Sequence, residues 1–452
     1  MSNPRRALWR ALDALWLAVL AVYVLAGVDE VPFHGDESSL ITMSRDYYHL
    51  VQRRDIEPVL YDPDPADPMV QELRLINGTV GKMAMGFAWD MAGLTEADLN
   101  EPWLWGADWE YNASTGHVPG ARLLHTARLS SAVLTAISVA AVFAIAWIAG
   151  GRPAAWAAAL IYASDPVVLL NGRRAMMEGA HLAFATLAML AALLVVREQG
   201  RRPMPRRRRL VGLTALFGIL SGVAVASKHP ALIVVGVGFA AIASEPLIRR
   251  TPSPLSRQHI LRWTGAGVLA LLVFLLLNPA WWSDPLPMPG RVLDMRSTLL
   301  SQQVAGFGGY DGWGERLAGL ARQTLGVGRQ YYEAQGWDEW IADEIAHYED
   351  SWLAGRGTGL LWTLALGGAL VIGMWRLGRR WREGAAWTIL LWTGITAVAL
   401  FIATPLEWQR YYLPLRPPLA VMSGCGVAAL AMVMARRAAG DARGFRDPDR
   451  TG

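Results

Sequence analysis

Two adjacent carboxylates in the segment VPFHGDESSL, residues 31–40, are the first residues whose types could do chemistry. Asp36 and Glu37 come directly after the first apolar stretch of the chain, and His34 lies two residues before Asp36. A carboxylate just outside a membrane can take a proton from a reacting hydroxyl or bind a cation. The same residues also suit the start of a helix, because Asp is a common N-cap residue. The segment alone leaves both interpretations open.

Cationic residues lie in three short hairpins between later apolar stretches. Arg173 and Arg174 stand in NGRRAMMEG, Lys228 and His229 in SKHP, and Arg410 in LEWQRYYLP. Ionisable groups at membrane level are costly to bury and are usually paired or functional. Three such hairpins on one side of a membrane suit an anionic head group, most simply a lipid phosphate. The alternative is that each long side chain reaches the water at the membrane surface.

Further polar residues accompany these hairpins. Glu178 follows Arg174 by four residues, which is the spacing of an ion pair on a helix. Tyr411 follows Arg410 directly. The histidines show no HExxH or other tight metal-ligand spacing. His34 near Asp36, and Asp343 four residues before His347, are the pairs that could hold a metal. No metal site is predicted, and dependence on a divalent cation stays open.

The elements that must position these residues are membrane spans. The chain has 452 residues, of which 53% are hydrophobic and 21 are Trp, a residue that favours membrane–water interfaces. Apolar runs of about 20 residues can cross a bilayer. We interpret the apolar N-terminal run as an uncleaved first span. The ten predicted spans are residues 8–27, 127–149, 153–171, 176–196, 210–227, 230–248, 262–281, 357–376, 386–404 and 413–435.

The short loops predict how these spans are oriented. Basic residues crowd the segments 197–209, 248–262, 376–383 and 435–446, together with the N-terminus. Cytoplasmic loops of membrane proteins carry this excess of Lys and Arg. The N- and C-termini are therefore expected in the cytoplasm, and the long segments 28–126 and 282–356 on the extracytoplasmic side. The net charge of +4 reflects these loops, and no nucleic-acid-binding motif accompanies it.

The same pattern divides the chain into parts. Residues 1–281 form a first transmembrane module that includes the extracytoplasmic loop 28–126, and residues 282–356 form a second such loop. Residues 357–440 hold the last spans, and 441–452 a cytoplasmic tail. A single cysteine, Cys425, excludes an intrachain disulfide and any cysteine-based zinc site, and its apolar surroundings predict burial.

In their order along the chain, several segments resemble one enzyme family. They are FHGDESSLITMSRDYYHL, INGTVGKMAMG, ARLSSAVL, NGRRAMMEGAHLAF, SKHPAL, NPAWWSDPL and RYYLPLRPPLAV. This order is similar to that of the polyprenyl-phosphate-dependent glycosyltransferases with the GT-C fold. Within them it resembles the protein O-mannosyltransferases and their bacterial relatives, including the enzyme that adds aminoarabinose to lipid A. INGTVGKMAMG keeps Gly81 and Lys82 but lacks the prolines usual there.

The resemblance implies an all-α polytopic membrane protein that transfers a sugar from a lipid-linked donor to an acceptor hydroxyl with inversion. It implies that Asp36 is the general base, and that Glu37 positions the acceptor or orients an arginine. Lys228 with Arg173 or Arg174 is expected to stabilise the leaving phosphate, with Arg410 and Tyr411 nearby. The acceptor is a protein, a lipid or a glycan. No nucleotide sugar is needed, in agreement with the lack of a nucleotide-binding motif.

Two other classes compete with this interpretation. A transporter or flippase for a lipid-linked or anionic solute would use similar cations, but nearer the middle of the bilayer. A non-catalytic scaffold or receptor would leave the outward-facing cations unexplained. The distinguishing prediction is spatial: Asp36, Arg173, Lys228 and Arg410 should converge on one cavity.

Overall fold

Long apolar helices make up most of the molecule. The structure is a computed structural model that describes residues 4–201, 206–248, 256–325, 328–333, 336–357 and 359–444, the last eight by their backbone alone. Within these ranges the regular elements are all helical, and nine segments are long and apolar enough to cross a membrane. The nine are α1 (Pro4–Ala26), α7 (Ala121–Gly150), α10 (Glu178–Gln199), α11 (Arg207–Ser227), α12 (Ala231–Ile248), α13 (Arg257–Leu277), α17 (Leu360–Arg379), α18 (Gly384–Ala403), and η7 (Gln409–Leu415) with α19 (Arg416–Gly444) as far as Arg436. The protein is therefore a multi-pass membrane protein.

The third predicted span, 153–171, is not a continuous helix. It consists of α8 (Arg152–Ala163) and α9 (Pro166–Arg173), which meet at an angle of 60°. Proline cannot donate a helical hydrogen bond, so the helix breaks before Pro166. The Asp165 carboxylate then caps α9 by accepting hydrogen bonds from the Val167 and Val168 amides at 3.0 and 3.2 Å. If this bent pair counts as one span, the described chain has the ten that the sequence predicts.

Small residues let several spans approach closely. Gly424 of α19 lies against Ala154 and Ala158 of α8, and Gly426 lies against Ala369 of α17. A Cβ atom at Gly426 would come within 1.9 Å of the Ala369 carbonyl oxygen, so only glycine fits at this crossing. Close contact of small residues is a usual way for helices to associate in a membrane. Between these two glycines, Cys425 is 1% exposed, which confirms its predicted burial.

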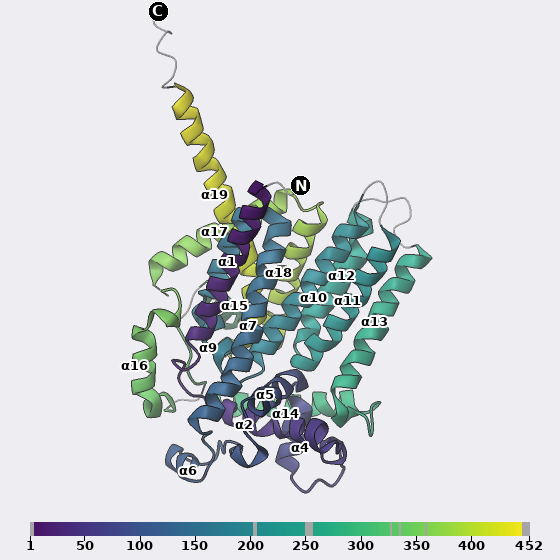
Figure 1. Cartoon of the computed structure of the whole chain (residues 1–452), viewed down its shortest axis with the longest axis vertical. Coiled ribbons are helices and arrows are strands. Elements are labelled where there is room, and N and C mark those ends of the chain that lie inside the picture. The colour runs from purple at the N-terminus through teal and green to yellow at the C-terminus, as the bar shows by residue number, and fades with distance from the viewer. Residues whose placement is uncertain are drawn as a thin grey trace, which may run out of the picture.

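The two long loops fold into helices, several of which lie at one end of the bundle, while α16 lies along its flank (Figure 1). The first loop contains α2 (Gly35–Met43), α3 (Arg45–Tyr47), η1 (Tyr48–Arg53), η2 (Glu57–Val59), α4 (Pro68–Ile76), α5 (Thr79–Met91), η3 (Glu96–Asp98) and α6 (Trp109–Ser114). The second contains η4 (Pro279–Trp281), α14 (Met288–Phe307), α15 (Trp313–Leu325), η5 (Asp338–Ile341), α16 (Ala342–Asp350) and η6 (Trp352–Ala354). Figure 1 shows α2, α4, α5, α6 and α14 at the end opposite the start of α1.

The described parts of the basic segments lie at the other end. Arg207 begins α11 and Arg257 begins α13, on the side where α1 starts, and α17 ends there at Arg379 (Figure 1). Residues 202–205 and 249–255 of the basic loops, and the predicted tail from 445 onward, lie outside the described residues. Parts of both long loops thus share one end of the molecule, and the basic segments share the opposite end.

Candidate active site

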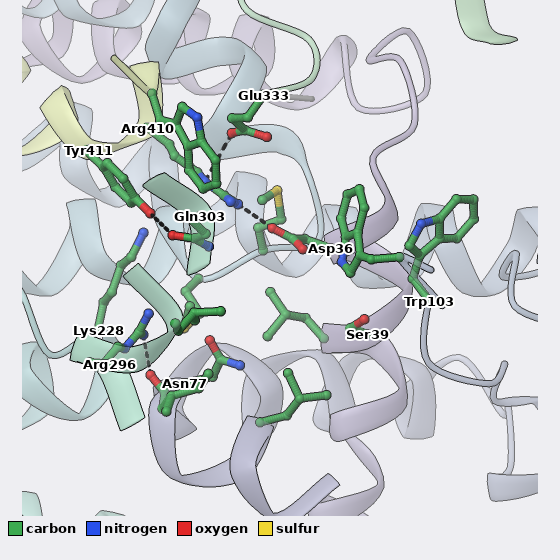
Figure 2. A pocket seen from close by; sticks show the side chains of 18 of the residues that line it. Asp36, Ser39, Asn77, Trp103, Lys228, Arg296, Gln303, Glu333, Arg410 and Tyr411 are labelled. Carbon is green, nitrogen blue, oxygen red and sulfur yellow. Dashed lines mark hydrogen bonds and ion pairs between the residues drawn. The ribbon is translucent and has the colours of Figure 1, made fainter. Parts of the chain in front are cut away.

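A cavity of about 620 Å³ lies where the two long loops meet the ends of the spans. Its walls come from α2, α4 and α14, from η7, and from the turns that precede α10 and α12. Figure 2 shows Asp36 and Trp103 toward one side of this cavity, and Lys228, Arg296 and Tyr411 toward the other. Residues more than 370 positions apart in sequence therefore line one space.

The start of α2 sends the two adjacent carboxylates in different directions. His34 caps this helix: its Nδ1 accepts a hydrogen bond from the Asp36 amide at 3.0 Å, and its own amide donates to the Glu37 carboxylate at 3.1 Å. Neighbouring residues on a helix point about 100° apart. The Asp36 side chain consequently faces the cavity and is 26% exposed, whereas the Glu37 side chain is 0% exposed.

Glu37 is fully engaged behind the cavity. Its two oxygens accept hydrogen bonds from Nε and Nη2 of Arg128 on α7, at 2.7 and 2.8 Å, and one also accepts from the Ala175 amide at 2.8 Å. Burial opposes its ionisation, but Arg128 outweighs that effect and lowers the Glu37 pKa. Glu37 does not line the cavity, and its contacts with Arg128 agree with the alternative expectation, that it orients an arginine.

Arg410 bridges two carboxylates at the cavity wall. Its Nη1 donates to Asp36, and its Nε lies 3.1 Å from a Glu333 oxygen. The other Glu333 oxygen lies 3.0 Å from His34 Nε2. Because His34 Nδ1 accepts from an amide, the proton of the neutral ring is on Nε2, which donates to Glu333. Glu333 belongs to the second long loop, so both loops and η7 fix this group together.

These contacts keep both carboxylates ionised. Burial opposes ionisation of Asp36, but the positive charge of Arg410 outweighs burial, so the Asp36 pKa lies below its usual value. The same balance, again with Arg410 as the main opposing group, lowers the pKa of Glu333 to about 2. At neutral pH Asp36 is therefore ready to accept a proton.

A second set of polar residues lies across the cavity. Lys228 Nζ donates to Glu178 Oε1 at 2.6 Å, and Tyr411 donates to Gln303 Oε1 at 3.3 Å. Arg296 of α14 donates to the Ile76 carbonyl and forms no ion pair with any carboxylate of the described residues. Burial lowers the Arg296 pKa, because the buried guanidinium has lost part of its hydration. Lys228, Arg296 and Arg410 thus present positive charge to one space.

The structure brings together five of the predicted residues. Asp36, Glu178, Lys228, Arg410 and Tyr411 line the cavity, and His34 supports Asp36 and Glu333 from behind.

Arg173 lies elsewhere, although it was expected beside the phosphate. Its Nε and Nη2 each donate at 2.8 Å, to the Val24 and Tyr23 carbonyls near the end of α1. The last carbonyls of a helix lack intrahelical donors and carry partial negative charge. Arg173 is 0% exposed, does not line the cavity, and instead joins the end of α1 to α9.

Arg174 is also outside the cavity lining. It donates to the Pro32 carbonyl at 3.2 Å, and its Nη2 has no hydrogen-bond partner among the described residues. Burial lowers its pKa, opposed chiefly by Glu37. Its contribution to the site is the positive charge that it adds behind Glu37.

Lys82 and His229 were predicted as supporting residues and lie away from the cavity too. Lys82 Nζ lies 2.6 Å from Asp46 Oδ2, and Arg74 holds the same carboxylate at 2.9 Å, which ties α3, α4 and α5 together. The His229 ring packs near Phe274 and Trp281. Burial lowers the His229 pKa to about 4, so the ring is neutral at pH 7.

Arg296, Gln303 and Glu333 are among the cavity residues that sequence reasoning missed. A signal for two of them exists, because Arg296 and Gln303 are seven residues apart and so share one face of a helix. Glu333 stands in the irregular segment before Gly336 and carries no such signal. The described residues contain no group of three or more His, Cys, Asp or Glu side chains that could hold a metal. His347 pairs with Glu30 at 3.2 Å rather than with Asp343.

Comparison with known proteins identifies the fold. Residues 95–281 match the family described as dolichyl-phosphate-mannose-protein mannosyltransferase. No curated protein sequence matches the chain. ArnT from Cupriavidus metallidurans, solved bound to undecaprenyl phosphate, superposes with a TM-score of 0.52 and 13% identity over 92% of this chain. The matched region is 60% of the ArnT chain, so this protein corresponds to only part of it.

Two further solved structures are less similar. The Archaeoglobus fulgidus oligosaccharyltransferase, tethered with an acceptor peptide, has a TM-score of 0.49 and 14% identity, covering 93% of this chain and 50% of its own. The Saccharomyces cerevisiae Pmt1-Pmt2 complex, bound to the sugar donor, has a TM-score of 0.40 and 16% identity, covering 58% and 33%. The fold assignment depends on the ArnT similarity. The chain has the GT-C glycosyltransferase fold, and its residues 95–281 match the dolichyl-phosphate-mannose-protein mannosyltransferase family.

Proposed function

We propose that this protein is a membrane glycosyltransferase that moves a sugar from a polyprenyl-phosphate donor to an acceptor hydroxyl. One observation carries the proposal: a carboxylate held by Arg410 and two further cations, Lys228 and Arg296, face one another across a single cavity at the end of a membrane bundle. A volume of about 620 Å³ is in the range of small-molecule sites. Asp36 would lie at the acceptor side, and Lys228 and Arg296 at the phosphate side.

The transfer step follows from this separation. The acceptor hydroxyl gives its proton to the Asp36 carboxylate while its oxygen forms a bond to the anomeric carbon. The bond between that carbon and the phosphate oxygen breaks, and the electron pair leaves with the phosphate. Attack and departure occur on opposite faces of the sugar, so the configuration inverts. A general base contributes about 10²- to 10⁴-fold to such a step.

The cations would stabilise the leaving phosphate. Charge on its oxygen grows as the bond breaks, and fixed donors aimed at growing charge are among the largest catalytic terms. Lys228 and Arg296 come from different elements, the turn after α11 and helix α14, and both line the cavity. Arg296 has no carboxylate partner among the described residues, so it is the cation most free to meet a phosphate.

The membrane sides and the parts of the chain follow from the same proposal. The excess of Lys and Arg at the end opposite the cavity favours that end as cytoplasmic, and hence an extracytoplasmic active site. Residues 1–281 would hold the catalytic loop 28–126 and its supporting spans. Residues 282–356 would complete the site through Arg296 and Glu333, and 357–440 would supply Arg410.

Purified protein in lipid nanodiscs, given labelled polyprenyl-phosphate sugars and a membrane extract, tests the proposal. We expect label to pass from one donor to an extract component with the wild-type protein, and not with Asp36→Asn. Label that crosses the bilayer while staying on its lipid would instead indicate a flippase. Transfer at the wild-type rate by Asp36→Asn would remove the assignment of the base.

A further inference from the structure

Tryptophan rings from both long loops form one wall of the cavity and continue beyond it. Trp103, Trp105 and Trp337 line it, and Trp337 lies 5.6 Å from each of the other two rings. Trp109 and Trp340, which do not line the cavity, stack with their ring planes 6° apart and their centroids 6.5 Å apart. We call these five residues the tryptophan mouth.

The mouth differs from a membrane anchor in its contacts. Its rings pack on one another, and they join residues 103–109 to residues 337–340. Trp105 and Trp340 remain 45% and 51% exposed. The Trp103 ring is 2% exposed and lines the cavity, yet its Nε1 has no hydrogen-bond partner among the described residues. A buried indole N–H usually has one, but the Trp103 Nε1 is enclosed and lies against Gly35.

Both segments that carry these rings are acidic. Residues 99–120 contain three carboxylates, and residues 336–350 contain six, with no Lys or Arg in either segment. Glu101, Asp108, Glu110, Asp338, Glu339 and Asp343 are exposed, and none forms an ion pair with Lys or Arg within the described chain. The phosphate side of the same cavity carries Lys228 and Arg296. The cavity therefore has cations on one side, and aromatic rings carried by acidic segments on the other.

We propose that the tryptophan mouth and the carboxylates around it form the docking surface for the acceptor, and that they select a polypeptide segment with Lys or Arg beside the acceptor hydroxyl. Aromatic faces attract cations, most strongly on Trp, and unpaired carboxylates reinforce that attraction. The surface repels phosphorylated lipids and anionic glycans. A polypeptide supplies a hydroxyl and a cationic side chain a few ångströms apart.

This inference rests on the proposed function, because it names the acceptor of that reaction. It also predicts the side from which each substrate enters the cavity. The segment would enter from water over Trp340 and Trp109 and reach Asp36 past Trp105. The donor would approach from the Lys228 side, so each substrate meets charge of opposite sign to its own.

Binding without donor tests the inference separately from catalysis. Fluorescent peptides of one sequence, with Ser flanked by Lys, Gln or Glu, are titrated against the wild-type protein in uncharged nanodiscs. We expect the Lys peptide to bind about tenfold more tightly than the Gln peptide, which corresponds to about 1.4 kcal/mol, or a few exposed charge contacts. The Glu peptide should bind more weakly than both. Raising the salt concentration should reduce the preference, because exposed charges are screened.

Two variants locate the surface. Glu339→Lys with Asp343→Lys should remove or reverse the preference for Lys. Asp64→Lys with Asp294→Lys changes the net charge equally at exposed positions away from the mouth and should leave the preference intact. Trp340→Ala should weaken the binding of the Lys peptide several-fold, with the thermal midpoint of each variant checking that it folds.

Each outcome decides one question. Equal binding of all three peptides, or equal effects of the two charge variants, overturns the inference even if sugar transfer is observed. Tighter binding of a glucosamine oligomer than of the Lys peptide overturns the polypeptide assignment. If the Lys preference and its location hold while no sugar is ever transferred, the docking surface stands and the proposed function fails.

Discussion

Two groups of ion pairs lie on either side of α2 and contain the same residue types. The cavity group consists of Asp36, Arg410 and Glu333 with the Glu178–Lys228 pair. The buried group consists of the Glu37–Arg128 pair and of Asp46 with Lys82 and Arg74. Members of the first group line the large cavity, whereas none of the second group does; Asp46 and Arg74 border only a separate small cavity of about 40 Å³. A charge that borders a cavity can exchange its partner for a substrate, and a charge enclosed by protein can only hold the fold.

The largest expected effect separates these two roles at adjacent residues. Asp36→Asn should lower sugar transfer by about 10²- to 10⁴-fold, because the amide cannot accept the hydroxyl proton. Folding should survive, since Arg410 keeps Glu333 as a partner. Transfer rate and thermal midpoint are measured on the same preparation. A variant that unfolds instead would mean that Asp36 belongs with the buried group.

Glu37→Gln should do the reverse. Removing this carboxylate leaves the Arg128 guanidinium buried without its counter-charge, which costs about 3–5 kcal/mol of stability. We expect a much lower yield and thermal midpoint, and a loss of activity that follows the loss of folded protein. The double variant Glu37→Gln with Arg128→Met should regain part of the stability. Normal stability with low activity in the single variant would show that Glu37 acts in the reaction.

A smaller effect is expected on the phosphate side. Arg296→Ala should raise the KM for the donor about 10- to 100-fold, as expected for the loss of a charge-assisted contact of about 1.5–3 kcal/mol. The KM for the acceptor should change little. Lys228→Ala should also weaken donor binding more than acceptor binding. It leaves Glu178 without its partner, so Arg296→Ala is the cleaner test. Equal effects on both substrates would remove the phosphate assignment.

The membrane architecture could be predicted from sequence because each span signals itself locally. Ten apolar runs and their basic loops were read from composition alone, and the main error concerned Pro166, where a capped helix start bends the third span. Apolar length says that a segment crosses the bilayer but does not say how its two halves are joined.

The site was predicted less completely because its partners come from distant segments. Asp36, Lys228 and Arg410 could be picked out as charges at membrane level. Arg173 has the same appearance in the sequence, yet it binds the end of α1, since only the packing of α9 decides which way its side chain points. Glu333 was missed because an irregular loop gives no periodic signal.

The smallest expected effect concerns pH and tests how the cavity group is coupled. Arg410 lowers the Asp36 pKa, whereas Glu333 raises it. Activity requires ionised Asp36, so it should persist at neutral and mildly acidic pH and fall only as pH drops below the usual aspartate value near 3.9. Arg410→Gln should move this acid limb of kcat/KM upward by about one pH unit, because the carboxylate loses its nearest cation.

Glu333→Gln should move the acid limb of kcat/KM to lower pH. It removes a negative charge near Asp36, and Asp36 becomes the only ionised carboxylate of the group that contacts Arg410. The two shifts are measured on kcat/KM for the acceptor at saturating donor, with stability followed at each pH. If the three side chains titrated independently, the two variants would not shift the acid limb in opposite directions. If both variants moved the acid limb the same way, Asp36, Arg410 and Glu333 would not titrate as one coupled group. The cavity group would then not differ electrostatically from the buried group in the way that the comparison requires.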